Sequence, residues 1–123
     1  MQTLYVGFFG ALGCLVRYFF SSWIHAFVAV PIPFGTLAVN VLGSLAIGLL
    51  MGGDLHHPLL GGNLRIGLAV GFLGGFTTFS TFSYETVRLL ENGNVGAAVF
   101  NVLLNVVLCL LAAWLGILLA RQI

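Results

Sequence analysis

Charged side chains are scarce in this sequence of 123 residues, at 6% of all positions, and lysine is absent. A soluble domain of ordinary composition has about 25% charged and about 45–50% apolar residues. Here the apolar share is 60% and the mean hydropathy is +1.14. The sequence also has no basic patch to bind nucleic acid and no glycine-rich loop to hold a phosphate. These absences exclude an ordinary soluble protein and indicate an integral membrane protein.

Groups that could carry out catalysis or hold a metal through side chains are equally few. Cys14 and Cys109 lie in separate apolar segments, where the role of a small buried hydrophobic residue is favoured over a disulfide. No nucleophile motif is present, and Asp54 with His56 and His57 is better interpreted as a solvated turn than as a metal site. The sequence therefore predicts that the protein is not an enzyme.

Four segments are apolar and long enough to cross a bilayer as helices. They cover residues 3–24, 34–53, 64–87 and 95–120. The first segment has no positively charged start and no small-residue cleavage site, so we expect a retained helix rather than a signal peptide. No connector is large enough to form a soluble catalytic domain. The predicted fold is all-α, a single four-helix transmembrane domain over residues 1–123.

The third segment contains an unusual polar run, Gly71-Phe-Leu-Gly-Gly-Phe-Thr-Thr-Phe-Ser-Thr-Phe-Ser83. Its glycines weaken a helix and its hydroxyl groups compete for main-chain partners, so we predict a helix broken between residues 74 and 80. A break frees backbone carbonyls, which must be satisfied inside a membrane. Hydroxyl groups, trapped water or a small hard cation would each meet that requirement.

Phenylalanines in this run recur every three residues, at Phe76, Phe79 and Phe82. A helix would stack them along one side, and an aromatic ring has a positive edge that can face an anion. The alternative is that they are ordinary core or lipid-facing side chains. The interleaved hydroxyls of Ser80 and Thr81 favour a path for an anion.

Polar residues recur every four positions on two other segments and so form stripes on helix faces. The stripes are Thr36, Asn40 and Ser44 on the second segment, and Asn101, Asn105 and Cys109 on the last. The Asn40 amide can donate to an anion without a full charge that would hold the ion too tightly. Each stripe is also compatible with interhelical hydrogen bonds alone, at about 0.6 kcal/mol per bond. The coincidence of the stripes with the polar run favours an ion path.

The charged residues bear on orientation and on the ends of the path. Arg65 and Arg121 lie on one side of the membrane and Arg88 on the other, so the positive-inside signal is weak. We expect insertion in both orientations and an antiparallel homodimer, with one weakly biased orientation as the alternative. Arg17 lies within the first segment, where it can reach the interface or hold a positive potential at a vestibule. The spacing of Glu85 and Arg88 predicts an ion pair.

Small residues on the third segment predict a close helix contact. Gly67, Gly71 and Gly75 recur every four residues and share one face. Their coincidence with the polar run favours a contact between subunits, and a contact within one subunit is the alternative.

Three motifs follow one another along the first three segments. They are residues 10–13 with Arg17-Tyr18, then Gly35-Thr-Leu-Ala-Val-Asn40, then the polar run 71–83 followed by Glu85. In this order they closely resemble the small fluoride channels of the Fluc family, also called CrcB proteins. On the last segment, where relatives typically offer hydroxyl groups, this sequence has Asn105 and Cys109 instead.

The resemblance implies an antiparallel, dual-topology homodimer with two pores. It implies a structural sodium ion, Na⁺, at the dimer centre, bound by the backbone carbonyls of Gly74 and Thr77 from both subunits. We therefore expect a fluoride-selective channel in the bacterial inner membrane, whose partners are a second copy of itself, fluoride and the lipid bilayer. The expected pore residues are Phe79, Phe82, Asn40, Thr36, Ser80, Thr81 and Asn105, and the expected vestibule residues are Arg17 and Glu85.

Two other functions are considered. A small multidrug exporter also has four helices and dual topology, but it needs a carboxylate deep in its first helix, where this sequence has Arg17. A non-transporting subunit of a larger membrane assembly would leave the polar stripe through Asn40 without a function.

Overall fold

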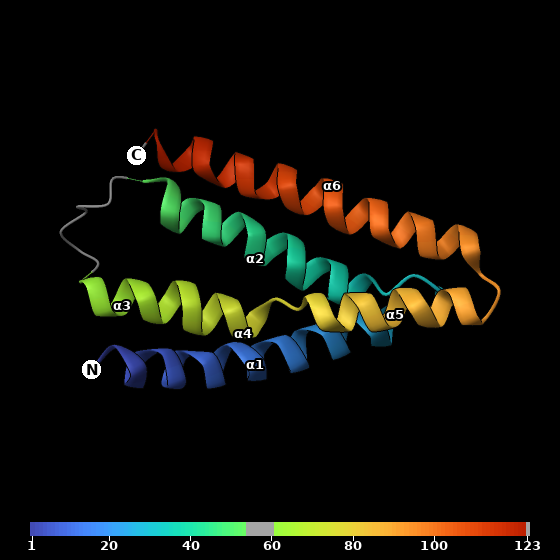
Figure 1. Cartoon of the computed structure of the whole chain (residues 1–123), viewed down its shortest axis with the longest axis horizontal. Helices are drawn as coiled ribbons and strands as arrows, with labels where there is room; N and C mark the ends of the chain where they lie inside the picture. Colours follow the sequence, from blue (N-terminus) through green and yellow to red (C-terminus); the bar gives the residue numbers. More distant parts are fainter. Residues whose placement is uncertain (54–60, 123) are drawn as a thin grey trace.

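The computed structural model describes residues 1–53 and 61–122. Within these residues, four helical spans are long and apolar enough to cross a membrane: α1 (Gln2–Phe27), α2 (Phe34–Gly52), a composite third span (Gly62–Glu91) and α6 (Val95–Ala120). Successive spans run in opposite directions, so the start of α1 and the end of α6 lie at the same end of the bundle (Figure 1). The predicted all-α architecture with four membrane-spanning helices is confirmed.

The third span is interrupted near its middle, as the polar run predicts. It consists of α3 (Gly62–Ile66), a π-helix η1 (Gly67–Leu73), α4 (Gly74–Phe76) and α5 (Phe79–Glu91). The chain is extended at the two residues between α4 and α5, where ψ is 159° at Thr77 and 114° at Thr78. The ribbon accordingly thins to a short unwound segment between these helices (Figure 1).

Threonine side chains close the two helix ends at the break. The N–H and the hydroxyl of Thr77 both donate to the carbonyl of Leu73, at 3.0 and 2.9 Å, which ends the first half. Thr78 is the N-cap of α5, because its Oγ1 accepts the N–H of Thr81 at 3.2 Å. The hydroxyls that destabilise a continuous helix here therefore also satisfy the ends that the break creates.

The glycine seam of the third span packs against α1 of the same subunit. A Cβ atom on Gly71 would stand 2.7 Å from the carbonyl oxygen of Val6, and one on Gly75 would stand 2.6 Å from that of Gly10. These glycines allow two backbones to approach closely. The interpretation of the seam as a contact between subunits is therefore wrong, and the alternative within one subunit holds.

A second close contact, between α2 and α6, was not anticipated from the sequence. Gly48 faces the backbone of Ala113, and Gly116 faces the backbone at Leu45 and Leu49. A Cβ on Gly116 would stand 2.8 Å from the Leu49 nitrogen. The two helices thus meet through a pair of facing glycines.

Substitution of Gly116 by alanine is expected to destabilise the protein by about 1–3 kcal/mol, because the added methyl group meets backbone that cannot rotate away. Unfolding in detergent, followed by tryptophan fluorescence, measures the change. Gly96→Ala is the matched control on the same helix, since its Cβ would meet nothing within 4 Å. Equal stability of the two variants would contradict the close contact.

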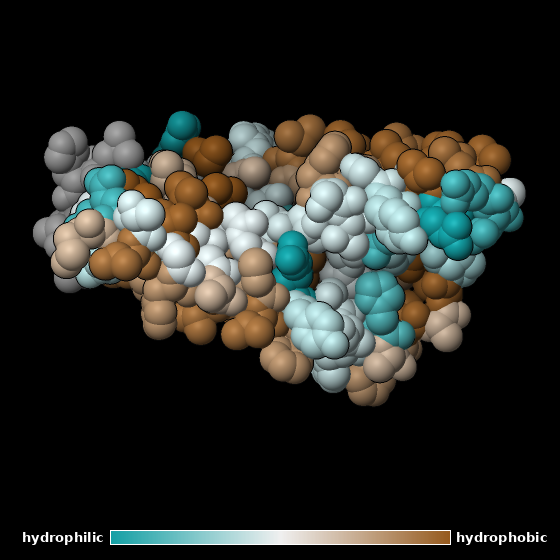
Figure 2. Space-filling model, turned by 60° about the horizontal axis from the view of Figure 1, so that its bottom comes forward, coloured by the Kyte–Doolittle hydropathy of each residue, from teal (hydrophilic) through white to brown (hydrophobic). Residues whose placement is uncertain are grey.

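Apolar side chains face outward over much of the bundle. Large hydrophobic residues of α1 and α6, among them Phe8, Phe19 and Leu110, are mostly exposed in the single chain. Hydrophobic side chains cover much of the face on which α1 lies, and polar ones gather toward one end of it (Figure 2). This surface suits contact with lipid or with another apolar protein surface.

Candidate ion-conducting site

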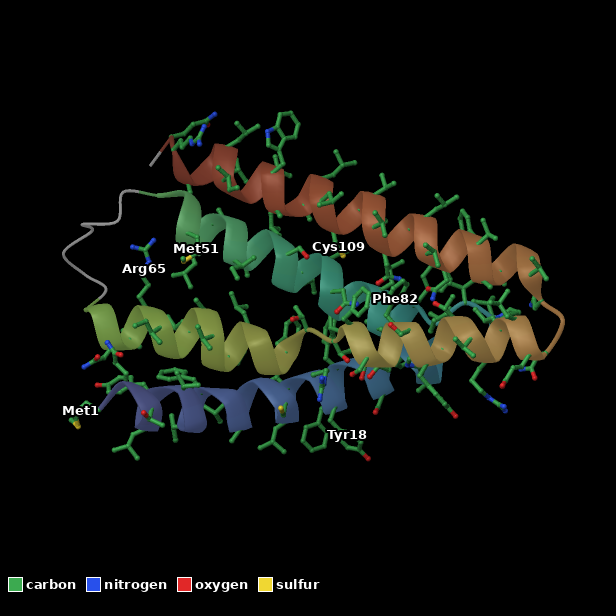
Figure 3. The ribbon with its side chains drawn as sticks, in the orientation of Figure 1. Met1, Tyr18, Met51, Arg65, Phe82 and Cys109 are labelled. Atoms are coloured by element: carbon green, nitrogen blue, oxygen red, sulfur yellow. The ribbon has the colours of Figure 1, made fainter. Side chains whose placement is uncertain are left out.

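A cavity of about 440 Å³ lies beside the break in the third span. Residues of α2, of both halves of the third span and of α6 form its walls. Phe82 and Cys109, which both line it, lie near the middle of the bundle next to the break (Figure 3). Its polar and aromatic lining residues are Asn40, Ser44, Thr77, Thr78, Phe79, Phe82, Asn105 and Cys109. The structure therefore brings most residues of the two polar stripes together with the broken part of the polar run.

The two phenylalanines at the start of α5 form an aromatic pair with different surroundings. The ring centroids of Phe79 and Phe82 are 5.3 Å apart, with 57° between the ring planes. Phe82 is 7% exposed, inside the subunit, whereas Phe79 is 78% exposed and faces away from it. One ring thus lines the cavity from within, and the other stands at its open side.

Phe76 does not continue this pair. It is buried instead against Phe72, with ring centroids 6.0 Å apart, and near Phe20 of α1. The prediction of three rings along one side is therefore wrong. The extended residues between Phe76 and Phe79 break the helical register on which that prediction depended.

Asn40 joins α2 to the backbone at the break. Its Oδ1 accepts the N–H of Thr78 at 2.8 Å, and its Nδ2 donates to the carbonyl of Thr78 at 3.1 Å. The amide thus replaces both helical hydrogen bonds that Thr78 lacks in its extended conformation. The same Nδ2 also donates to Oδ1 of Asn105 at 3.1 Å, so both amide hydrogens are engaged within the subunit.

The hydrogen bonds continue from Asn105 along α6 and back to α5. Nδ2 of Asn105 donates to the backbone and side-chain oxygens of Asn101, at 3.0 and 3.2 Å. Nδ2 of Asn101 donates to the hydroxyl of Thr86 at 2.9 Å, and that hydroxyl donates to the carbonyl of Phe82 at 2.7 Å. Asn101 is completely buried. The two asparagines of the α6 stripe therefore belong to one connected network of side chains.

Glu85 and Thr36 form a separate polar contact. The hydroxyl of Thr36 donates to Oε1 of Glu85 at 2.9 Å. The predicted pair between Glu85 and Arg88 is wrong, because Arg88 instead bonds the carboxylate of Glu91 at 2.9 Å, at the exposed end of α5. Glu85 borders a second, smaller cavity of about 230 Å³, together with Tyr84 and Arg88.

Arg17 extends from α1 to the break. Its Nη1 lies 3.4 Å from the carbonyl oxygen of Thr77, to which it donates. Gly74, the other residue implied as a sodium ligand, lies at the exposed side of the third span, and a Cβ there would meet nothing within 4 Å. The guanidinium thus contacts one of the two carbonyls that the resemblance associates with a cation.

Ser80 and Thr81 lie at the exposed start of α5, where both side chains contact the hydroxyl of Thr78, at 3.3 and 2.9 Å. The described walls of the larger cavity include neither of them. Within residues 1–53 and 61–122, no three His, Cys, Asp or Glu side chains come together to hold a metal. Asp54, His56 and His57, for which the sequence predicts a solvated turn, lie outside the described residues.

Comparisons with known proteins match nearly the whole chain. The family model described as CrcB-like protein, Camphor Resistance (CrcB), matches residues 4–117. The chain belongs to the CrcB family. It is 56% identical over 123 residues to a Syntrophotalea carbinolica protein named Fluoride-specific ion channel FluC, and the match covers all of both chains. Relatives of the same name from Geotalea daltonii and Geobacter metallireducens are 54% identical over 124 residues and 55% identical over 118 residues.

The Geotalea match covers all of both chains, and the Geobacter match covers 96% of this chain and 95% of its relative. Membership in the CrcB family confirms the resemblance inferred from the three motifs. The name shared by these relatives is that of an ion channel and not of an enzyme, in agreement with the sequence. A CrcB protein with four apolar spans is a multi-pass membrane protein.

Proposed function

We propose that this CrcB protein is a fluoride-selective channel that lets fluoride leave the bacterial cytoplasm passively across the inner membrane. The observation that carries the proposal is the interrupted third span. It places Phe82 and the polar residues of three spans around one cavity whose described lining has no charged side chain. The choice of fluoride as the conducted ion rests on the relatives named as fluoride-specific channels. They are identical to this chain at more than half of their matched positions.

Uncharged groups suit the conduction of a small anion. Fluoride is strongly hydrated, so a path must replace its water with donors and ring edges, yet must hold it weakly enough to release it. Phe79 and Phe82 offer adjacent rings, and hydroxyl and amide groups surround them. Both hydrogens of the Asn40 amide already donate to protein oxygens, so a fluoride ion bound by this amide would replace one of those two acceptors.

A second copy of the chain, inserted in the opposite orientation, completes the site in this proposal. Phe79 and Gly74 are exposed at the open side of the cavity, although both belong to the most polar part of the third span. A second copy packed there would cover Phe79 and supply the missing wall. The cations on the two sides are nearly balanced, which lets a chain insert either way.

Dual topology predicts that a reporter fused after residue 123 is found on both sides of the membrane in comparable amounts. A fusion that is active when cytoplasmic and one that is active when periplasmic measure the two populations. Adding arginines after Ile123 should shift the balance toward one side and reduce fluoride resistance. A reporter found on one side only in the parent protein would contradict the antiparallel arrangement.

A structural sodium ion at the dimer centre is also part of the proposal. The carbonyls of Gly74 and Thr77 are hard oxygen ligands, and one of them already attracts the guanidinium of Arg17. Two antiparallel copies would bring two such carbonyls each to the dimer axis. The ion would neutralise carbonyl dipoles that the break leaves without helical partners.

Reconstitution into liposomes tests the function. Vesicles loaded with fluoride should lose it when a potassium ionophore is added, as measured by a fluoride electrode, whereas chloride-loaded vesicles should lose little chloride. Purification and assay without sodium should lower the fraction of active channels. Vesicles that carry no fluoride current in either condition would favour a non-transporting role.

A further inference from the structure

Within the proposed channel, Asn101 of α6 is fully buried and connects two helices by hydrogen bonds, although it does not line the cavity. Asn101 is completely shielded from solvent, and its side chain bonds both to α5 and to the next turn of its own helix. A buried amide is costly unless all its groups are paired. Its burial therefore calls for a role beyond filling space, which an apolar residue would serve equally well.

Hydrogen bonds through Asn101 link the start of α5 to its second turn by way of α2 and α6, and the backbone of α5 closes the loop. From Thr78 the path passes through the amides of Asn40, Asn105 and Asn101, and the hydroxyl of Thr86 returns it to the carbonyl of Phe82. Thr78 and Thr86 flank the segment that carries Phe79 and Phe82. This path, which we name the amide clamp, therefore ties both ends of that segment to α2 and α6.

The direction of donation along the clamp is consistent from end to end. Asn105 directs its Nδ2 at Asn101, which leaves its Oδ1 to accept from Asn40. Asn40 in turn directs its Oδ1 at the N–H of Thr78. Without the side-chain oxygen of Asn101, the Asn105 amide keeps only the backbone carbonyl of Asn101 as an acceptor. The Asn105 side chain, and with it the pairing of Asn40 at the break, is then held less firmly.

We propose that Asn101 is a positioning residue for the ion path: through the amide clamp it fixes where Phe79 and Phe82 stand relative to the break. This inference rests on the proposed function, because it assigns the residue a task in conduction. Nothing in the clamp requires Asn101 to touch the ion. In this view Asn101 supports the pore without lining it, whereas Asn105 belongs both to the clamp and to the cavity lining.

The test compares Asn101→Leu, which keeps the branched shape of the side chain but removes the amide, with Asn94→Ala. The control removes the cap at the start of the same helix, where the Asn94 side chain accepts the N–H of Ala97 outside the clamp. Hydrogen exchange in detergent is measured for peptides that cover residues 77–86. We expect exchange there to rise about tenfold in Asn101→Leu and to stay unchanged in Asn94→Ala. A tenfold rise is on the order of the loss of two hydrogen bonds, one from Asn101 to Thr86 of α5 and one from Asn105 within α6.

Conduction supplies the second readout. The fluoride rate per reconstituted dimer should fall about fivefold in Asn101→Leu, with a reduced preference for fluoride over chloride, and should stay at the parent value in Asn94→Ala. Unchanged exchange in Asn101→Leu would overturn the clamp. Faster exchange with parental rate and selectivity would reduce Asn101 to a structural residue and overturn the positioning role.

A second variant and the exchange measurement distinguish a failure of the clamp from a failure to fold or to conduct. Should Asn101→Leu fail to fold, Thr86→Val removes the acceptor on α5 with little change in volume, and the same expectations apply. A parent protein that carries no fluoride would refute the channel, but the exchange measurement would still show whether the clamp holds the break.

Discussion

Replacement of Phe82 by isoleucine is expected to lower fluoride efflux from liposomes about tenfold or more, and Phe79→Ile is expected to do the same. The physical reason is the loss of a positive ring edge at the cavity, because an aliphatic side chain of similar bulk has no quadrupole to face an anion. An aromatic contribution of about 1.4 kcal/mol corresponds to a factor of ten. The fluoride electrode measures the initial efflux rate per reconstituted dimer.

Phe8→Ile is the matched control for this pair. Phe8 is 64% exposed on α1 and does not line the cavity, so its rate should equal that of the parent protein. Tryptophan fluorescence in detergent checks that all three variants are folded. Parental efflux from both Phe79→Ile and Phe82→Ile would remove the argument that ring edges replace the water of fluoride.

Replacement of Asn40 by leucine is expected to abolish conduction and to destabilise the protein by about 2–4 kcal/mol. The substitution leaves the N–H and the carbonyl of Thr78 without their side-chain partner and removes the donor to Asn105. Each buried group that loses its partner costs about 1–3 kcal/mol, and an average interhelical bond in a membrane protein about 0.6. Unfolding by denaturing detergent measures the stability, and fluoride efflux measures the function.

Ser44→Ala serves as the control for Asn40→Leu. Ser44 lies one turn further along α2, on the same stripe and in the same cavity, but it makes no bond to the break. Its removal should leave the unfolding midpoint nearly unchanged. If the two variants were equally stable, Asn40 would not support the interruption of the third span.

The spans and the break could be predicted because their causes are local. Long apolar runs have few alternatives to a membrane-spanning helix, and the glycines and hydroxyls of residues 71–83 weaken a helix wherever they stand. The structure places the extended residues at Thr77 and Thr78, inside the predicted interval. Local chemistry also explains why the same threonines cap both new helix ends.

Contacts between side chains of different helices could not be predicted from patterns within one helix. Helical periodicity assigned Phe76 to the face of Phe79, but two extended residues reset the register between them. The spacing of Glu85 and Arg88 suited an ion pair, yet Glu91 is as near in sequence to Arg88, and Thr36 from another helix binds Glu85. Which helix faces which is set by the whole fold, and a pattern on one helix does not contain it.

The amide clamp illustrates the same limit. Asn101, Asn105 and Asn40 were each recognised as members of polar stripes, but their order of donation depends on the close approach of α2 to α6. That approach in turn depends on small residues spaced four apart on both helices, Gly48 and Gly52 on α2 and Ala112 and Gly116 on α6. The spacing of Gly48 and Gly52 was an available signal for a close contact of α2, but it does not say which helix makes that contact.

The described residues form an even number of spans, which restricts how two copies could be joined in one polypeptide. Because α1 starts and α6 finishes at the same end of the bundle, a short peptide bridge between tandem copies would force them to point the same way. Inverted halves could be joined only by a linker that itself traverses the bilayer. A gene fusion of this domain would therefore need to acquire an odd, additional crossing to keep an inverted pair.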